Sequence, residues 1–166
     1  MKAHSEIHYA VNPSSLGLVL VAQSAKGVCA VLLGDDLQTL QRDLKERFPE
    51  ANLIEGDAAL ATQVIGTLES PARGIDVPLD PQGTEFQQSV WKALREIPAG
   101  TTASYTDIAN RIGLPKSARA VAQACAANPL AVVVPCHRVV KSDGKLSGYR
   151  WGVERKRALL EREAVA

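Results

Sequence analysis

The sequence predicts an α+β protein with two parts, a small mixed α/β domain over residues 1–82 and a helix-turn-helix domain over residues 83–166. Two apolar runs typical of strands lie in the first part, whereas helical spacing of apolar residues dominates the second. Pro78, Pro81 and Gly83 mark the boundary between the two parts. A chain of 166 residues is long enough for one full core or two small ones.

The first part contains one predicted hairpin and two predicted helices. Residues 16–22 and 28–33 are β-prone runs joined by a glycine-containing connection, which is typical of a hairpin. Leucines at helical spacing predict a helix over residues 37–44, and Pro49 stops it. A second helix is predicted over residues 60–68. Because no residues in this part have catalytic spacing, we interpret it as a scaffold.

Two capping patterns predict where helices begin in the second part. Thr84 with Gln87 three residues later has the capping-box pattern, and an apolar stripe follows over residues 86–97. Ser104 with Asp107 has a similar cap pattern and starts a second, shorter helix. That helix ends at a glycine, and a three-residue turn leads directly into the next helical run. Two short helices around such a turn form the helix-turn-helix pattern.

The second helix of this pattern, over residues 116–127, is unusually rich in alanine. Between residues 117 and 127, Arg119 carries the only charge. The helix either packs tightly against a neighbour or is slim enough to enter a narrow groove, with Arg119 projecting from its start. Ordinary helix-turn-helix proteins read the major groove with long polar side chains, which are absent here. If the helix binds DNA, we expect it to do so without reading sequence.

Cys136 and His137 form a candidate reactive pair. The apolar run over residues 130–134 predicts a buried strand that leads to them. A thiol is nucleophilic only as the thiolate, and burial raises its pKa, so a base is needed nearby. Adjacent strand residues point to opposite faces, so a bridging water or an irregular backbone would be required. The alternative is that Cys136 is a small buried hydrophobe, which is our interpretation of Cys29 and Cys125.

The chain after this pair is predicted to form a turn over residues 141–145, a glycine-broken loop over residues 146–152 and a last helix. A hairpin after a helix-turn-helix would be a wing, and its Lys141, Lys145 and Arg150 could contact phosphates. The last helix places five residues on neighbouring positions: Val153, Lys156, Leu159, Leu160 and Glu163.

Charge is divided unequally between the two parts. Residues 1–82 carry six Lys and Arg against eleven Asp and Glu, whereas residues 83–166 carry thirteen against seven. This division suggests that the second part meets a polyanion, although surface charge that segregated by chance would look the same. The three cysteines have neither disulfide nor zinc spacing, which predicts a protein without a metal site. No apolar run is long enough for a signal segment or a membrane span, so we expect a cytoplasmic protein.

The hexapeptide PCHRVV at residues 135–140 resembles the active-site motif of the O6-alkylguanine-DNA alkyltransferases. Flanking matches are FQQSVWKAL from residue 86, SY at 104, RAVA from 119, NP at 128 and SGYRWGV from 147. The resemblance thus covers residues 84–163 and, more loosely, the first half. Within that family the sequence resembles the C-terminal catalytic part of Ada-type proteins and the free-standing bacterial enzymes. The resemblance implies a ribonuclease H-like N-terminal domain and a winged-helix C-terminal domain that carries the acceptor cysteine.

The resemblance also implies a role for each candidate catalytic residue. Cys136 matches the acceptor that takes the alkyl group irreversibly, once per molecule. His137 matches the base that acts through water, and Glu163 matches the carboxylate that orients its imidazole. Tyr105 matches the tyrosine that helps to rotate the nucleotide and that hydrogen-bonds the guanine. The implied reaction is single-turnover DNA repair without a cofactor, in which a methyl group moves from O6-methylguanine, and secondarily from O4-methylthymine, to Cys136.

The implied partner is double-stranded DNA with alkylated bases, bound through the minor groove by a monomer. Arg119 matches the residue that fills the gap left by a flipped nucleotide, and Asn128 matches the brace between the helix-turn-helix and the active-site segment. A slim alanine-rich helix suits the minor groove, where little sequence is read. Further residues implied in DNA binding are Lys116, Ala118, Ala122 and Arg150, and those implied in supporting the active site are Pro135 and Arg138.

Three other functions remain to be compared with alkyl transfer. Alkyltransferase-like binding proteins have tryptophan where this chain has Cys136. A winged-helix regulator would need base-reading side chains, and a thiol hydrolase would need an oxyanion site. Within the alkyltransferases, Arg150 and Trp151 stand where the mammalian proteins have small residues over the base, which disfavours large adducts such as benzyl. Lys156 matches a lysine near the same segment, or is a solvated helix residue.

Overall fold

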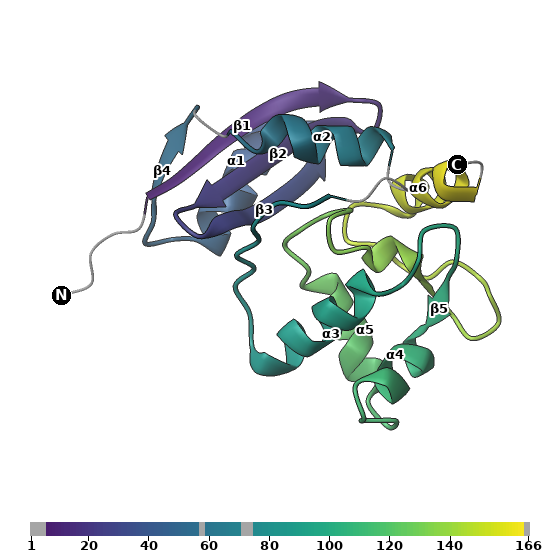
Figure 1. The fold of residues 1–166 in the computed structure, drawn as a ribbon. Helices are drawn as coiled ribbons and strands as arrows, with labels where there is room; N and C mark the ends of the chain where they lie inside the picture. Colours follow the sequence, from purple (N-terminus) through teal and green to yellow (C-terminus); the bar gives the residue numbers. More distant parts are fainter. Residues whose placement is uncertain (1–5, 57–58, 71–74, 165–166) are drawn as a thin grey trace.

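The computed structural model describes residues 6–56, 59–70 and 75–164, which form a mixed α+β fold (Figure 1). The first half is built on a four-stranded sheet of β1 (Glu6–Ser14), β2 (Gly17–Ser24), β3 (Gly27–Gly34) and β4 (Asn52–Glu55). The strand order is β3-β2-β1-β4. The pairs β1–β2 and β2–β3 are antiparallel, and β4 runs parallel to β1.

The predicted hairpin is confirmed as β2 and β3, and β1 and β4 are additional strands. Gly27 at the turn has φ 148°, and a Cβ there would lie 2.4 Å from the carbonyl oxygen of Pro78, so only glycine fits. His8 lies in β1 opposite Gln23. The sequence did not predict β1, because this segment contains polar residues. Its pairing with two neighbouring strands depends on the tertiary fold, which local composition does not indicate.

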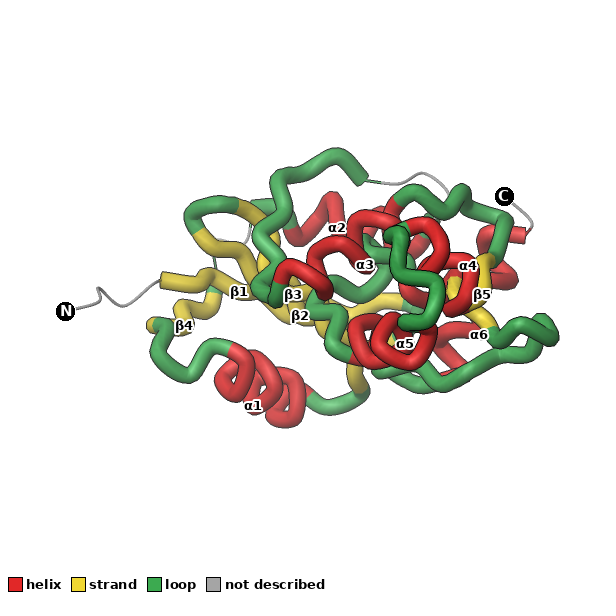
Figure 2. The backbone as a smooth tube through the Cα atoms, turned by 90° about the horizontal axis from the view of Figure 1, so that it is seen from below, coloured by secondary structure: helices red, strands yellow, loops and turns green. Residues whose placement is uncertain are grey.

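Both predicted helices of the first half are confirmed, as α1 (Leu37–Arg47) and α2 (Ala61–Glu69). Asp36 caps α1 by accepting a hydrogen bond from the Thr39 amide at 3.2 Å. Helix α1 packs on β3, whereas α2 packs on β1 and β2, and the two helices lie on opposite faces of the sheet (Figures 1 and 2). Strands β2 and β3 are therefore buried on both faces, which explains their unbroken apolar composition.

The second half is mainly helical. Its helices are α3 (Glu85–Arg95), α4 (Tyr105–Arg111), α5 (Ala118–Ala126) and α6 (Val153–Ala164). Two short strands, β5 (Ala103–Ser104) and β6 (Val139–Val140), pair in parallel. Both predicted capping boxes form, at Thr84 with Gln87 and at Ser104 with Asp107. Helices α4 and α5 follow each other around a turn at Gly113 (φ 78°), as the helix-turn-helix pattern predicts.

The strand predicted over residues 130–134 is wrong. Within this run only Leu130 forms a bridge, to Val31 in the edge strand β3, and the chain then turns through Val132 at φ 67°. The Asn128 side chain accepts from the Leu130 amide at 2.9 Å and donates to the Val134 carbonyl at 2.9 Å. These bonds take the backbone groups that a strand would use in a ladder. The apolar run reflects burial, not regular strand geometry.

The predicted wing is also wrong in its form. Residues 141–152, all of which the structure describes, make turns and contain no strand, and β6 before them pairs in parallel with β5 instead of starting a hairpin. The turn at the start of this segment is confirmed, because Lys141 and Lys145 are joined by a backbone hydrogen bond of 3.0 Å. We call residues 141–152 the 141–152 loop.

Helix α6 connects the two halves of the molecule (Figure 1). Near its start, Arg155 donates to the Leu16 carbonyl at 2.7 Å and to the Asp35 carboxylate at 2.8 Å. Near its end, Arg162 donates to the Leu68 carbonyl at 2.8 Å and to Ser15 Oγ at 2.6 Å. The helix is thus fixed to the sheet half at both ends. Among the described helices, none has the length and apolar character that crossing a bilayer demands.

Candidate active site

Cys136 lies in a short 3₁₀ helix, Cys136–Arg138, directly after the irregular turn. Its side chain is buried, and Sγ accepts a hydrogen bond from Asn128 Nδ2 at 3.2 Å. Burial raises the pKa of the Cys136 thiol to about 11, opposed by the Asn128 hydrogen bond and by the positive charge of Lys156. The resting group is therefore a thiol, and it needs a base to become a nucleophile.

His137 and Glu163 form a buried pair beside this thiol. His137 Nε2 lies 2.6 Å from Glu163 Oε1, and neither side chain is exposed. Burial lowers the pKa of His137 despite the neighbouring carboxylate, so the imidazole is neutral at neutral pH. Because a carboxylate only accepts, the proton of this imidazole lies on Nε2. His137 Nδ1 is buried without a hydrogen-bond partner among the described residues, so its lone pair is available to take a proton.

Arg138 holds the carboxylate of this pair in place. Its Nε and Nη2 donate to Glu163 Oε1 at 3.0 and 2.8 Å, and its Nη1 donates to the Ile97 carbonyl at 2.7 Å. Burial opposes ionisation of Glu163, but the hydrogen bonds from His137 and Arg138 outweigh it and lower its pKa to about 2. Glu163 is thus a fixed anion that selects one tautomer of His137.

The backbone geometry resolves the difficulty posed by adjacent residues on a strand. In a 3₁₀ helix successive side chains are separated by about a third of a turn, so Cys136 and His137 do not point to opposite faces. Cys136 lines a pocket while His137 reaches into the interior toward α6. The 3₁₀ helix at Cys136–Arg138 is thus the irregular backbone that the Cys136–His137 pair needs, and the sequence did not predict where it lies.

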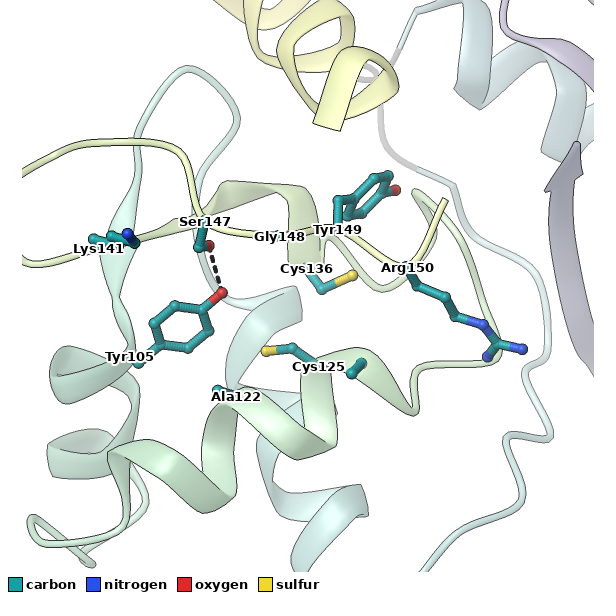
Figure 3. Close-up of a pocket in the computed structure, with 10 residues that line it drawn as sticks. Tyr105, Ala122, Cys125, Cys136, Lys141, Ser147, Gly148, Tyr149 and Arg150 are labelled. Atoms are coloured by element: carbon teal, nitrogen blue, oxygen red, sulfur yellow. Dashed lines mark hydrogen bonds between the residues drawn. The ribbon is translucent and has the colours of Figure 1, made fainter. Parts of the chain in front are cut away.

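The pocket above Cys136 has a volume of about 630 Å³ and lies between α4, α5 and the 141–152 loop (Figure 3). This volume is within the range of small-molecule sites. Its wall is made by ten residues: Tyr105, Ala122, Cys125, Ala126, Cys136, Lys141, Ser147, Gly148, Tyr149 and Arg150. In Figure 3, Cys136 lies between Tyr105 on one side and Arg150 on the other.

Tyr105 is the first residue of α4 and reaches the pocket from there. Its hydroxyl lies 2.5 Å from Ser147 Oγ in the 141–152 loop (Figure 3). Burial raises the pKa of Tyr105 above its usual value, opposed by the Ser147 hydrogen bond. The side chain is therefore a neutral phenol, able to donate one hydrogen bond to a group in the pocket.

Asn128 braces the reactive segment, as the resemblance implies. Its side-chain amide bonds the Leu130 amide, the Val134 carbonyl and Cys136 Sγ. Its own backbone carbonyl accepts from Arg150 Nη1 at 2.8 Å. Pro135 directly precedes the 3₁₀ helix as its N-cap residue. One asparagine thus connects α5, the irregular turn, the thiol and the 141–152 loop.

The residues expected to contact DNA lie along α5 and beside the pocket. Lys116 and Arg119 are exposed, whereas Ala118 and Ala122 are half-buried. Ala122 also lines the pocket, so the face of α5 that follows Arg119 leads toward Cys136. Arg150 already has partners within the protein: it donates to the Asn128 carbonyl, and its guanidinium lies over the Trp151 ring, 5.2 Å from the centroid.

Two residues near the site differ from the sequence interpretation. Cys125, interpreted as packing, is buried but also lines the pocket beside Cys136 (Figure 3).

Lys156 is fully buried, which excludes a solvated helix lysine. The signal for Lys156 was its helical spacing, because it shares the inner face of α6 with Leu159 and Glu163, and these residues are buried too. Ser147, quoted only as part of a motif, contacts both Tyr105 and Lys156.

Comparison with known proteins defines the class to which this fold and site belong. The family profile described as "6-O-methylguanine DNA methyltransferase, DNA binding domain" matches residues 85–165. An inducible methylated-DNA–protein-cysteine methyltransferase from Bacillus subtilis is 42% identical over 152 residues, which cover 88% of this chain and 84% of that protein. The chain belongs to the methylated-DNA–protein-cysteine methyltransferase family.

Within that family the chain is similar to part of a larger protein. The bifunctional transcriptional activator/DNA repair enzyme Ada of Escherichia coli is 53% identical over 161 residues, which cover 95% of this chain but only 46% of Ada. The chain thus spans about half the length of Ada. The crystal structure of Mycobacterium tuberculosis OGT in complex with DNA matches with a TM-score of 0.81 at 37% identity, covering 95% of this chain and 93% of that one. The α+β fold is therefore that of solved OGT structures.

Proposed function

We propose that the chain repairs DNA by transferring the methyl group of O6-methylguanine, and secondarily of O4-methylthymine, irreversibly to Cys136. The observation that carries this proposal is the position of Cys136 in the wall of a pocket, with the His137–Glu163 pair directly behind it. The thiol can be deprotonated by the neighbouring base, and its sulfur can attack an electrophilic carbon of a group bound in the pocket. The names of the relatives agree with this reaction.

The geometry supports a specific sequence of steps. The thiol proton of Cys136 passes through water to His137 Nδ1, and Glu163 stabilises the imidazolium that forms. The sulfur then bonds the methyl carbon as the carbon–O6 bond breaks, and guanine leaves with that electron pair. Tyr105 donates a hydrogen bond to the departing base. Because a thioether is not readily reversed by acids or bases of side chains, each molecule accepts one methyl group.

The same proposal includes the way in which DNA is bound. A base inside a duplex cannot reach a buried sulfur, so the target nucleotide has to be flipped out, at a cost of a few kcal/mol. Arg119 is exposed at the start of α5 and would fill the gap in the stack, while the small side chains Ala118 and Ala122 allow α5 to enter the minor groove. Lys116 would contact a phosphate. OGT of M. tuberculosis has been solved in complex with DNA, which supports DNA binding by this chain.

The organisation of the chain is part of the proposal as well. We infer a scaffold domain over residues 1–82, related to the ribonuclease H-like fold, and a catalytic domain over residues 83–166, related to the winged-helix fold. The first inference is supported by a sheet in which three antiparallel strands are extended by a parallel fourth. The second is supported by the α4–α5 pair, although the loop after β6 contains no wing strands. The protein would act in the cytoplasm as a monomer, without a cofactor.

The test is a single-turnover transfer experiment. The full chain is incubated with a duplex that contains one O6-methylguanine, and the added mass is located by peptide mass spectrometry. The proposal expects one methyl group per protein on the peptide that carries Cys136, and Cys136→Ala should bind the duplex without gaining mass. Methyl groups on another residue, or continued turnover beyond one equivalent, would contradict it. A second substrate duplex with O4-methylthymine tests the secondary activity in the same way.

A further inference from the structure

Tyr149, in the 141–152 loop, has a hydroxyl group to which the proposed function gives no role. Its side chain is half-buried and lines the pocket. The hydroxyl oxygen itself is buried and has no hydrogen-bond partner among the described residues. Burying an unpaired hydroxyl is costly, and phenylalanine would fill the same space without that cost. The group therefore needs a partner that the described part of the chain does not supply.

His137 Nδ1 is a second buried atom of the same kind, and it lies in the same region. The opposite nitrogen of this imidazole is fixed, because Nε2 bonds Glu163 Oε1 at 2.6 Å. Burial raises the pKa of Tyr149 well above its usual value, the charges of ionised Cys136 and Glu163 raise it further, and Arg155 opposes them. In Figure 3 the Tyr149 ring lies beside Cys136. The hydroxyl is thus close to both the thiol and the carboxylate that holds His137.

One water molecule can serve both unpaired atoms and the thiol together. A buried water needs two to four polar partners, and each unpaired atom supplies one. The water would accept from the Tyr149 hydroxyl and from the Cys136 thiol, and it would donate to the lone pair of His137 Nδ1. Asn128 donates to Cys136 Sγ at 3.2 Å, so the S–H bond stays free to donate to the water. Three hydrogen bonds then fix the place and the orientation of the water.

We propose that Tyr149 is a positioning residue whose hydroxyl holds the water that carries the proton from Cys136 to His137. This inference rests on the proposed function, whose proton-transfer step it makes specific. The water takes the thiol proton and gives one of its own protons to Nδ1, so it stays neutral, and Tyr149 keeps its proton throughout. The sulfur then bonds the electrophilic carbon, and the leaving group departs with the electron pair of its bond to that carbon.

Several charged or titratable side chains surround the thiol, the imidazole and this hydroxyl. They come from α4, α5, the 3₁₀ helix, the 141–152 loop and α6: Tyr105, Cys125, Arg138, Arg150, Arg155, Lys156 and Glu163. None of them hydrogen-bonds His137 Nδ1 or the Tyr149 hydroxyl. All of them are retained in Tyr149→Phe, so a comparison of its pH profile with that of the wild type isolates the hydroxyl.

The variant Tyr149→Phe removes the hydroxyl and keeps the ring. Its matched control is Tyr9→Phe, because Tyr9 is buried in β1 and its hydroxyl accepts from Gln41 Nε2 at 3.2 Å, in the half without candidate site residues. The first assay needs no DNA: the Cys136 sulfur displaces iodide from iodoacetamide, and the product is located by peptide mass spectrometry. At neutral pH we expect Tyr149→Phe to react about 3- to 10-fold more slowly, the effect of one neutral hydrogen bond, and Tyr9→Phe to react at the wild-type rate.

The pH profile and a second background separate positioning from a purely structural role. The loss of rate should shrink as the pH rises toward the thiol pKa of about 11, because hydroxide then removes the proton directly. In a His137→Gln background the base is absent, so Tyr149→Phe should cause no further loss of alkylation rate. Glu163→Gln serves as the background if His137→Gln melts early. Methyl transfer from an O6-methylguanine duplex at saturating DNA should show the same fold-loss as alkylation.

Two results would overturn the inference. One is a rate for Tyr149→Phe equal to that of the Tyr9→Phe control at neutral pH. The other is an equal fold-loss with and without His137, because groups that do not act through one another have additive effects. The two assays also distinguish this inference from the proposed function. A wild type that transfers no methyl group refutes the proposed function, whereas the alkylation rates decide whether Tyr149 serves the proton transfer.

Discussion

Replacing Glu163 by Gln tests the central pair of the site with the smallest change in shape. The amide can still accept from Arg138, but it carries no charge and its NH₂ group no longer selects the Nε2–H tautomer of His137. His137 Nδ1 would then lose its role as the proton acceptor. In a catalytic triad, loss of the tautomer-selecting carboxylate costs about 10⁴ in rate. We expect Glu163→Gln to slow methyl transfer by about 10²- to 10⁴-fold, because here the base acts through water.

The same substitution should lower stability by an amount that the structure allows us to calculate. The pKa of Glu163 falls from 4.5 to about 2 on folding, which corresponds to about 3 kcal/mol of stability at neutral pH. Removing one charge of a buried pair costs about 3–5 kcal/mol in proteins generally, which is of the same order. Because the folded-state pKa is depressed, this stability is present above about pH 4.5 and is lost as the pH falls toward 2.

The assays are rapid-quench transfer to a labelled duplex and urea unfolding at a series of pH values. Glu161→Gln is the control, because Glu161 is exposed on the same helix. The free energy of unfolding of the wild type should fall between pH 4.5 and 2 by about 3 kcal/mol more than that of Glu163→Gln. A Glu163→Gln protein that transfers methyl groups at the wild-type rate, or that shows the full acid-dependent loss of stability, would refute the reasoning.

Three further predictions concern DNA, the adduct and the fold. Arg119→Ala should slow transfer from duplex DNA by about 10-fold or more, while transfer from the free base O6-methylguanine stays unchanged, because the cost of nucleotide flipping applies only to the duplex; equal losses on both substrates would contradict this. Arg150→Ala removes the contacts with Asn128 and Trp151 and should raise the rate on O6-benzylguanine relative to O6-methylguanine, measured in competition; an unchanged ratio would mean that the loop does not restrict adduct size. Gly27→Ala should lower the free energy of unfolding by about 3 kcal/mol or more, because its Cβ would clash with Pro78. In Gly66→Ala, in α2, the added Cβ meets no atom within 4 Å, so this variant should raise the free energy of unfolding by about 0.5–1 kcal/mol. Similar effects of the two substitutions in urea unfolding would contradict this prediction.

Local patterns in the sequence were sufficient for the helices and for the reactive residues. The capping boxes at Thr84 and Ser104 depend on contacts three residues apart, so the sequence alone predicts them. The hexapeptide at residues 135–140 located Cys136 and His137, and helical spacing put Glu163 on the inner face of α6. The distance of 2.6 Å between His137 and Glu163 joins residues 26 positions apart, and only the fold provides it.

The failures arise where hydrogen bonds that residue patterns do not report decide the structure. The apolar run over residues 130–134 was predicted to be a strand, but Asn128 bonds the Leu130 amide and the Val134 carbonyl, and the amides of Val133 and Val134 bond within the turn. Strand β1 was missed because its partners β2 and β4 determine it, not its own composition. The burial of Lys156 depends on Ser147 and Gly148 folding back over α6 from the preceding loop. For β1 a contact with a distant part of the chain overrides the local preference, whereas at residues 130–134 the competing contact comes from Asn128, two and six positions away.

The two arginine contacts of α6 affect how the molecule can be divided. All the candidate site residues lie between Tyr105 and Glu163, so the second half looks sufficient by itself. Yet the helix that delivers Glu163 is held by Arg155 and Arg162 to carbonyl, carboxylate and hydroxyl groups of residues 15–68. Cutting the chain near residue 83 would remove these contacts at both ends of the helix, so that the position of the Glu163 carboxylate would depend on its bonds with His137 and Arg138. We therefore expect the smallest working unit to include the acidic half, although none of the candidate site residues lies in it.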